Sequence, residues 1–96
     1  MKQNYYPKEQ IKEVFSEPGI YRLFTLNNYN LNLVYIGKSV NLRKRLMEHN
    51  RTPYMEFAYF DYEFYPKGKI SEVEKQEISL FEQKYGCLPQ YNNQRG

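Results

Sequence analysis

Two apolar segments separated by four polar residues constrain the fold of this chain more than any other feature. The segment IYRLFTL at 20–26 and the segment LNLVYIG at 31–37 both alternate in character and contain residues that favour strands. The intervening NNYN has the asparagines that tight turns favour. The pattern predicts an antiparallel β-hairpin whose turn centres near Asn28.

The flanking segments predict the remaining elements. A short lead-in helix at 7–16 ends at Pro18-Gly19, and helices at about 41–50 and 71–86 enclose a third strand at 57–65. We therefore expect an α/β protein, a small ββαβα sandwich with a three-stranded antiparallel sheet flanked by helices and preceded by the lead-in helix.

Side-chain patterns give the expected faces and caps. In the lead-in helix the predicted inner side consists of Ile11, Val14 and Phe15. In the second helix it consists of Leu42, Leu46 and Met47, with Ser39 or Asn41 as the cap. For the last helix, Ser71 and Glu74 have the spacing of a capping box.

The length of 96 residues fits one domain, which we divide into a lead-in helix at 1–17 and a functional domain at 18–96. The single cysteine, Cys87, excludes an internal disulfide. No signal-peptide core and no membrane-length apolar run is present in the sequence, so we expect a cytoplasmic protein without a membrane partner.

Positive charge is concentrated in one part of the chain. The net charge is +3, whereas the segment 38–51 alone carries +4, and the remainder therefore sums to −1. Such a local excess favours a polyanionic partner, although a solvated helix face has the same pattern. The cations of this segment are Lys38, Arg43, Lys44, Arg45 and Arg51.

Glu77 interrupts the apolar stripe of the last helix. It lies four residues after Val73 and four before Phe81, where a leucine would be expected. The carboxylate could pair with Lys84 or Arg45, or reach water at the edge of the stripe.

A second set of residues gathers around the hairpin. With the turn near Asn28, Tyr21 lies opposite or diagonal to Tyr35. On the following helix Arg45 and His49 are one turn apart, at the rim of the apolar face. Each has an ordinary explanation when taken alone: tyrosine packing, an arginine whose charge reaches water, and a surface or cap histidine.

Taken together, these residues resemble the GIY-YIG nuclease family. The tripeptides GIY at 19–21 and YIG at 35–37 are followed by Lys38, Arg45, His49, Glu77 and Asn92. The segments EPGIYRL and YIGKSVNLRKRL are also similar to the nuclease domain of the bacterial excision-repair C subunit, and standalone GIY-YIG endonucleases share the tripeptides. The resemblance runs from Pro18 to Asn92.

The resemblance implies a function and a set of site residues. Family members are divalent-metal-dependent phosphodiesterases that act mostly on DNA, with Mg²⁺ or Mn²⁺, one ion per site. By position, the implied catalytic residues are Tyr21, Tyr35, Lys38, Arg45, His49 and Glu77, with Glu77 as the metal ligand and Glu74 as its competitor. The implied nucleic-acid-binding residues are Lys38, Arg43, Lys44, Arg45, Arg51 and Asn92.

The expected reaction is hydrolysis of a DNA phosphodiester bond by an activated water, one strand per active site. Tyr35 or Tyr21 would accept the proton of the water, and we favour Tyr35 because Lys38 and Arg45 follow it closely. Repair, restriction, recombination and mobile-element roles all fit, with a protein partner or a separate domain for targeting. Two alternatives are a non-catalytic nucleic-acid-binding module on the same fold and, less favoured, an interaction protein that docks a partner on the strand 57–65.

Overall fold

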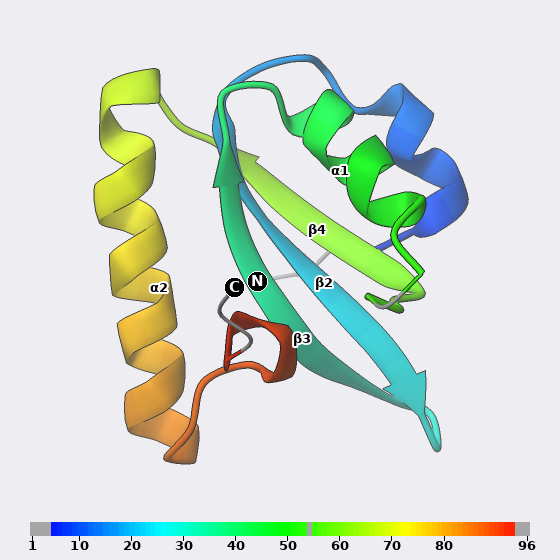
Figure 1. The fold of residues 1–96 in the computed structure, drawn as a ribbon, viewed down its shortest axis with the longest axis vertical. Helices are drawn as coiled ribbons and strands as arrows, with labels where there is room; N and C mark the ends of the chain where they lie inside the picture. The colour runs from blue at the N-terminus through cyan, green and yellow to red at the C-terminus, as the bar shows by residue number, and fades with distance from the viewer. Residues whose placement is uncertain (1–4, 54, 94–96) are drawn as a thin grey trace.

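The computed structural model describes residues 5–53 and 55–93 and contains one antiparallel sheet between two helical layers. Figure 1 shows α2 on one side of the sheet and α1, with the N-terminal segment, on the other. The strand order is β1-β4-β2-β3, which leaves β3 at an edge. In chain order the elements are β1 (Tyr6–Pro7), the 3₁₀ helix η1 (Lys8–Glu13), β2 (Gly19–Asn27), β3 (Asn30–Ser39), α1 (Leu42–Asn50), β4 (Tyr59–Phe64), the 3₁₀ turn η2 (Lys67–Lys69), α2 (Ile70–Tyr85) and the 3₁₀ helix η3 (Gln90–Asn93).

The predicted hairpin is confirmed. Strands β2 and β3 pair from Gly19 opposite Ser39 to Asn27 opposite Asn30, with a register shift after Leu23. The turn places Asn28 at φ 49° and Tyr29 at φ 68°, the left-handed conformations that two-residue hairpin loops require. An asparagine tolerates this conformation well, which explains how the polar run could predict the turn.

The two faces of the sheet bury two separate sets of side chains. Alternation along β2 directs Tyr21 and Leu23 to the α1 side and Ile20 to the α2 side. On the α1 side the core also holds Leu42 and Leu46, as predicted. The smaller core on the α2 side joins Ile20 to Ile36 and Ile70.

The N-terminal segment differs from the prediction. The sheet has four strands and not three, because Tyr6 and Pro7 pair with Phe60 and Tyr59 of β4. A two-residue strand containing proline gives no alternating pattern, so the sequence could not reveal it. The lead-in helix is a 3₁₀ helix that ends at Glu13, and Ile11 and Val14 are buried while Phe15 is 70% exposed.

The last helix also departs from the prediction at its start. Helix α2 begins at Ile70, with Lys69 as N-cap and no side-chain cap, so the capping box of Ser71 and Glu74 is wrong. The preceding turn η2 continues directly into the helix, which moves the start upstream of Ser71. At the other end Gly86, at φ 77°, stops the helix as expected.

Two residues assigned to apolar faces are exposed instead. Leu80 of α2 is 62% exposed, and Met47 of α1 is 38% exposed. The α2 side chains that pack on the sheet are Ile70, Val73, Ile78 and Phe81. The inner face of α2 is thus turned toward Ile78, away from Leu80.

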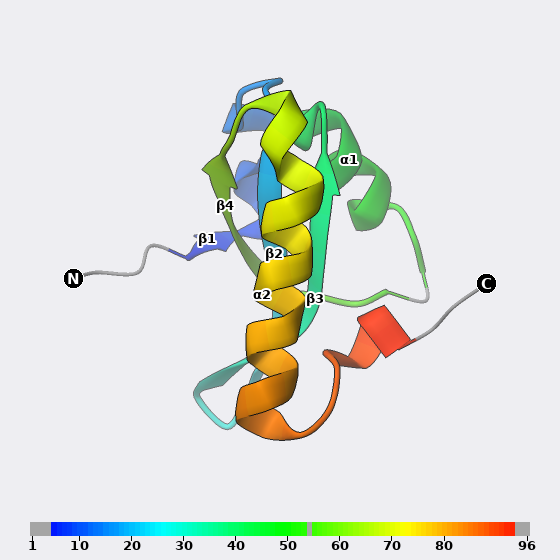
Figure 2. The same ribbon diagram turned by 90° about the vertical axis from the view of Figure 1, so that its left-hand side faces the viewer.

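The C-terminal segment covers the free edge of β3. It leaves α2 at Gly86, and η3 then lies against β3 (Figure 2). Pro89 is fully buried, and Tyr91 packs against the core on the α1 side. The segment therefore passes from one face of the sheet to the other around this edge.

None of the helices within the described residues has the length and apolar character needed to cross a bilayer.

Candidate active site

Three aromatic side chains meet on the α1 face of the sheet: Tyr21 of β2, Tyr35 of β3 and His49 of α1. Their ring centres are separated by 5.9 Å for the two tyrosines, 5.4 Å for Tyr21 and His49, and 5.2 Å for Tyr35 and His49. The Tyr21 hydroxyl and Nε2 of His49 share a buried hydrogen bond of 2.7 Å. We call these residues the aromatic triad; they confirm the predicted approach of the two tyrosines.

Gly37 permits this arrangement. Gly37 lies directly opposite Tyr21 in the hairpin. Tyr35, two residues before Gly37 in β3, is the diagonal neighbour of Tyr21. A Cβ atom at position 37 would overlap the ring of Tyr21 and lie 2.8 Å from Cε2 of Tyr35. The glycine of the second tripeptide is therefore required by the close approach of the tyrosine rings.

The triad residues differ in their access to solvent. Tyr21 is 1% exposed and His49 is 6% exposed, whereas Tyr35 is only half-buried. Because it is the most accessible of the three, Tyr35 is the member that a bound substrate can reach.

Burial sets the protonation of the two enclosed members. It raises the pKa of Tyr21 far above the ordinary value of 10.0, and the neighbouring Tyr35 adds to this while Arg45 opposes it. Burial, followed by the charge of Arg45, lowers the pKa of His49 from 6.5 to about 4. At neutral pH the phenol of Tyr21 keeps its proton and the imidazole of His49 is uncharged.

Arg45 extends from α1 beside the triad. Its Nη1 donates to Oε1 of Glu48 at 2.9 Å, and its side chain remains 46% exposed. The guanidinium therefore retains donors for a ligand, while its charge influences Tyr21 and His49.

The outer surface of α1 carries three further predicted cations. Arg43, Lys44 and Arg51 are exposed, and with Met47 they line a shallow hollow of about 330 Å³. Asn41 fixes the start of this helix by accepting a hydrogen bond from the backbone N–H of Lys44 at 3.1 Å. The predicted nucleic-acid-binding cations of α1 therefore form one accessible group.

Lys38 and Glu74 form a pair at the end of β3. The Lys38 ammonium donates to Oε1 of Glu74 at 3.1 Å, and the Glu74 side chain is 19% exposed. This end of β3 lies between α1 and the first turns of α2 (Figure 1). Glu74 thus faces the edge of the sheet that carries the YIG tripeptide.

Glu77 does not face the aromatic triad, contrary to our expectation. Its Oε1 accepts a hydrogen bond from Nη1 of Arg22 at 2.8 Å on the α2 side of the sheet. Arg22 follows Tyr21 in β2, so the two side chains point to opposite faces. The sheet itself therefore separates Glu77 from both tyrosines and from Arg45.

Arg22 is the polar residue that the sequence interpretation missed. Its Nε donates to Oδ1 of Asp61 at 2.7 Å, and Glu63 lies 3.7 Å from its Nη2. Arg22 and Asp61 are direct cross-strand partners. A single cation in one apolar strand and a single aspartate in another were the available signal, because opposite charges favour such positions.

The side chain of Asn92 is hydrogen-bonded to the backbone of the edge strand β3. Its Oδ1 accepts from the Ile36 N–H at 2.8 Å and its Nδ2 donates to the Ile36 carbonyl at 2.9 Å. The amide thus pairs with the free edge of β3 as a neighbouring strand would. Both ends of the side chain are occupied by this contact.

Metal ligands are sparse around these residues. Within 5–53 and 55–93, no group of three or more His, Cys, Asp or Glu side chains is placed to hold a metal ion. Mg²⁺ needs only one or two carboxylates when water and phosphate oxygens complete its shell. Glu74 can serve in this way, because the partner that holds it is a partly exposed lysine.

Two solved structures share this fold. The magnesium-bound GIY-YIG N-terminal endonuclease domain of UvrC from Thermotoga maritima aligns with a TM-score of 0.58 at 21% identity, covering 88% of this chain and 92% of that chain. A tyrosine-to-phenylalanine point mutant of the same domain, bound to its catalytic divalent cation, aligns with a TM-score of 0.59 at 21% identity, covering 92% and 94%. Scans of the sequence against protein-family models and against curated proteins find no match.

The chain therefore has the GIY-YIG fold, and the predicted resemblance is confirmed at the level of the fold. The two tripeptides lie at adjacent positions of the hairpin, where Gly37 and the paired tyrosines make contact.

Proposed function

We propose that this protein is a divalent-metal-dependent endonuclease that hydrolyses a DNA phosphodiester bond with an activated water, one strand per active site. The aromatic triad carries the proposal: two phenols and a neutral imidazole are held together beside an exposed arginine, at the edge of the sheet. The fold shared with two cation-bound endonuclease domains supports it.

We assign the acceptance of the water proton to Tyr35. It is the accessible phenol, whereas Tyr21 is enclosed and holds its proton more tightly than an ordinary tyrosine. Tyr21 and His49 then have a positioning role, since their hydrogen bond fixes the wall against which Tyr35 rests. A phenol needs nearby positive charge to act as a base, and Arg45 supplies part of it.

Arg45 has the role of stabilising the negative charge of the transition state. Its planar fork of donors matches phosphate oxygens in a way that a lysine does not. The exposed cations Arg43, Lys44 and Arg51 extend the positive surface along α1 and would hold the DNA backbone. Lys38 is proposed as a further phosphate contact at the end of β3.

For the metal ligand we now favour Glu74 over Glu77. Both glutamates extend from α2, but Glu74 lies at the end of β3 that carries the YIG tripeptide and is held by a partly exposed lysine, whereas Glu77 is bound to the more enclosed Arg22. A Mg²⁺ or Mn²⁺ ion would polarise the scissile phosphate and neutralise charge on the leaving oxygen. The chain contributes the carboxylate, and water and phosphate would complete the coordination.

Nicking of supercoiled plasmid DNA with Mg²⁺, Mn²⁺ or EDTA tests this proposal. We expect metal-dependent nicking by the wild type and a loss of about a hundredfold for Tyr35→Phe, in line with a positioned general base. Glu74→Gln should lose activity to a similar extent. Glu72→Gln is the matched control, because this exposed glutamate of the same helix turn should leave activity unchanged.

Three results would revise or overturn the proposal. Normal nicking by Tyr35→Phe would remove this tyrosine as the base. Loss of activity in Glu77→Gln but not in Glu74→Gln would return the metal to Glu77, the residue that the sequence favours. Absence of nicking by the wild type on plasmid and branched DNA would overturn the nuclease function.

A non-catalytic nucleic-acid-binding module is the second candidate. Two observations favour it: the sheet separates Glu77 from the triad, and the described residues do not form a group of three or more His, Cys, Asp or Glu side chains placed to hold a metal ion. This module would retain the positive surface of α1 without hydrolysis. DNA binding that is equally strong with EDTA, together with no nicking in Mg²⁺ or Mn²⁺, would select this alternative.

A further inference from the structure

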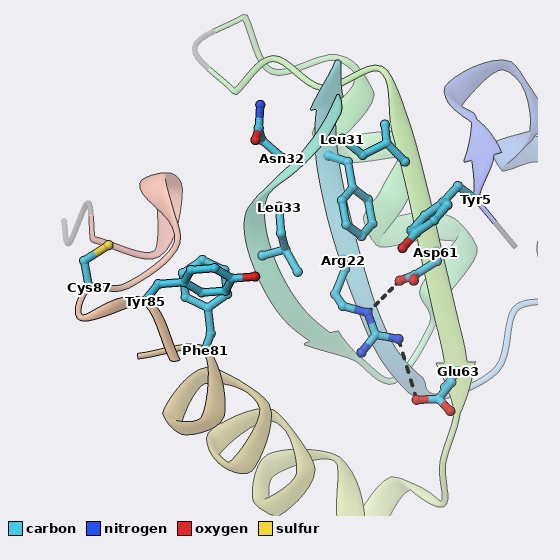
Figure 3. A pocket seen from close by; sticks show the side chains of 11 residues that line it. Tyr5, Arg22, Leu31, Asn32, Leu33, Asp61, Glu63, Phe81, Tyr85 and Cys87 are labelled. Carbon is cyan, nitrogen blue, oxygen red and sulfur yellow. Dashed lines mark hydrogen bonds and ion pairs between the residues drawn. The ribbon is translucent and has the colours of Figure 1, made fainter. Parts of the chain in front are cut away.

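A groove opens on the α2 face of the sheet, away from the aromatic triad. It has a volume of about 790 Å³ and lies between the sheet and the C-terminal half of α2 (Figure 3). Its lining is mixed: polar and charged side chains, among them Arg22, Asp61 and Glu63, alternate with apolar and aromatic ones. The apolar and aromatic part consists of Tyr5, Phe24, Leu31, Leu33, Phe81 and Tyr85. This groove lies outside the proposed active site and is not used by the proposed reaction.

The groove has an excess of negative charge along one side. Arg22 is surrounded by three carboxylates: Asp61 at 2.7 Å, Glu77 at 2.8 Å and Glu63 at 3.7 Å. One guanidinium cannot neutralise all of them. Asp61 and Glu63 line the groove, and Figure 3 shows both beside Arg22.

The two groove carboxylates differ in their environment. Glu63 has a side chain that is 56% exposed; it makes the long contact with Arg22 and accepts a hydrogen bond from the Tyr65 hydroxyl at 3.2 Å. Asp61 is buried, and burial raises its pKa against the opposing effect of Arg22, with Glu63 and Glu77 adding to the rise. A further cation near these two acids would therefore be favoured.

The aromatic walls favour the same kind of ligand. Tyr5 and Phe24 meet edge to face at 4.8 Å, and Phe81 and Tyr85 are 4.5 Å apart. Aromatic faces attract ammonium and guanidinium groups. The Lys84 ammonium already lies 5.4 Å from the ring centre of Tyr85, which shows a cation on this aromatic wall. With Glu77 counted beside Asp61 and Glu63, three acids stand near the two bases Arg22 and Lys84.

We propose that this groove binds a basic amphipathic segment of a protein partner, with a lysine or arginine beside Glu63 and Asp61 and apolar side chains on the aromatic walls. Charge complementarity selects this occupant, because the phosphates of a nucleic acid would be repelled by the same acids. The proposed DNA surface on α1 lies across the sheet. Such a partner and DNA can therefore bind at the same time, and the bound partner would direct the protein to its DNA substrate.

A labelled peptide of leucine and lysine in a helical amphipathic repeat is a suitable probe, with the corresponding leucine–glutamate peptide as its counterpart. We expect saturable binding of the basic peptide by fluorescence anisotropy, and none of the acidic peptide. The net charge of the protein is +3, so general electrostatic attraction would favour the acidic peptide instead. Preference for the basic peptide is thus specific to the groove.

Two pairs of variants locate the binding. Glu63→Gln should weaken binding of the basic peptide about fivefold or more. Glu82 is an exposed acid of α2 outside the groove, and Glu82→Gln should change the affinity less than about twofold. Tyr85→Ser should weaken binding, whereas Leu80→Ser should not, although both side chains are exposed on α2.

The outcomes separate this proposal from the nuclease function. Equal binding to both members of each pair, or stronger binding of the acidic peptide, would overturn the groove proposal. Plasmid nicking should be unchanged in Glu63→Gln and Tyr85→Ser. Peptide binding that disappears in these variants while nicking persists supports the groove, and the inference does not depend on the nicking result.

Discussion

At the residue scale, the hydrogen bond between Tyr21 and His49 links the candidate site to stability. His49 is buried and has a pKa of about 4, below the ordinary 6.5. In the unfolded chain the imidazole takes a proton as the pH falls below about 6.5, while the folded imidazole stays neutral. The free energy of unfolding should therefore decrease between about pH 6.5 and pH 4.

Urea denaturation of the wild type and of His49→Gln measures this effect. We expect the wild type to lose about 3 kcal/mol more than the variant between pH 7 and pH 4, since each unit of pKa difference corresponds to about 1.4 kcal/mol. The effect of other titrating groups cancels in this comparison. An identical pH dependence in both proteins would contradict the neutral, buried state of His49.

Gly37 provides a second test at the residue scale. Its Cα faces the tyrosine rings, and a Cβ there would force one or both rings to move. Gly37→Ala should therefore destabilise the protein by about 2 kcal/mol, the typical cost of overfilling a packed site. It should also reduce nicking, because Tyr35 moves.

Gly68→Ala is the control for this substitution. A Cβ at position 68 meets nothing within 4 Å, so its free energy of unfolding should change by less than about 0.5 kcal/mol. Chemical denaturation of both variants checks the contrast. Equal stability of Gly37→Ala and the wild type would show that the tyrosine rings can separate without cost.

At the element scale, the sequence was sufficient wherever a segment had a strong local pattern. The hairpin, helix α1 and the Gly86 stop of α2 were all predictable from periodicity and turn chemistry, whereas the sequence left the cap of α1 open between Ser39 and Asn41. Strand β1 was not predictable, because its two residues adopt strand structure only through their pairing with β4.

The prediction that Glu77 faces the tyrosines was wrong for a related reason. Periodicity placed it correctly toward the sheet, but a single helix does not tell which neighbour it will meet. The neighbour depends on how α2 crosses β2. In this structure the crossing places Nη1 of Arg22 2.8 Å from Oε1 of Glu77. The tyrosine pair was predictable because one hairpin contains both members, whereas the carboxylate comes from an element packed on the other face.

Asn92 gives a prediction about how two elements are joined. Its amide pairs with the backbone N–H and carbonyl of Ile36, as a neighbouring strand would at the edge of β3. Asn92→Ala should leave these partly buried groups without protein partners and cost about 1–3 kcal/mol. Amide hydrogen exchange at Ile36 should become faster.

Gln90→Ala is the matched control, since Gln90 lies exposed in the same 3₁₀ helix. It should change neither the unfolding free energy nor the exchange of Ile36. If Asn92→Ala abolished DNA binding without affecting exchange at Ile36, Asn92 would have the nucleic-acid role that the sequence predicts and not the structural one.

At the scale of the whole molecule, the sheet separates a positively charged surface on the α1 side from an acidic one on the α2 side. The α1 side carries the triad, Arg45 and the exposed cations, whereas the α2 side carries the acids around Arg22 and the groove that two of them line with aromatic side chains. A net charge of +3 conceals this division. DNA should therefore bind one face only, and its dependence on salt should reveal which face.

Counterion release makes this measurable. Each phosphate contact adds about 0.9 to the magnitude of the slope of log K against log salt concentration. Removing Arg43, Lys44 and Arg51 together, each as glutamine, should lower that magnitude by about 3 in fluorescence anisotropy titrations with a short duplex, if each cation contacts one phosphate. Lys75→Gln, at an exposed position of α2, should leave the slope unchanged. A reduction of the slope by Lys75→Gln comparable to that for each α1 cation would mean that DNA also contacts the α2 side, and the division between the two faces would be wrong.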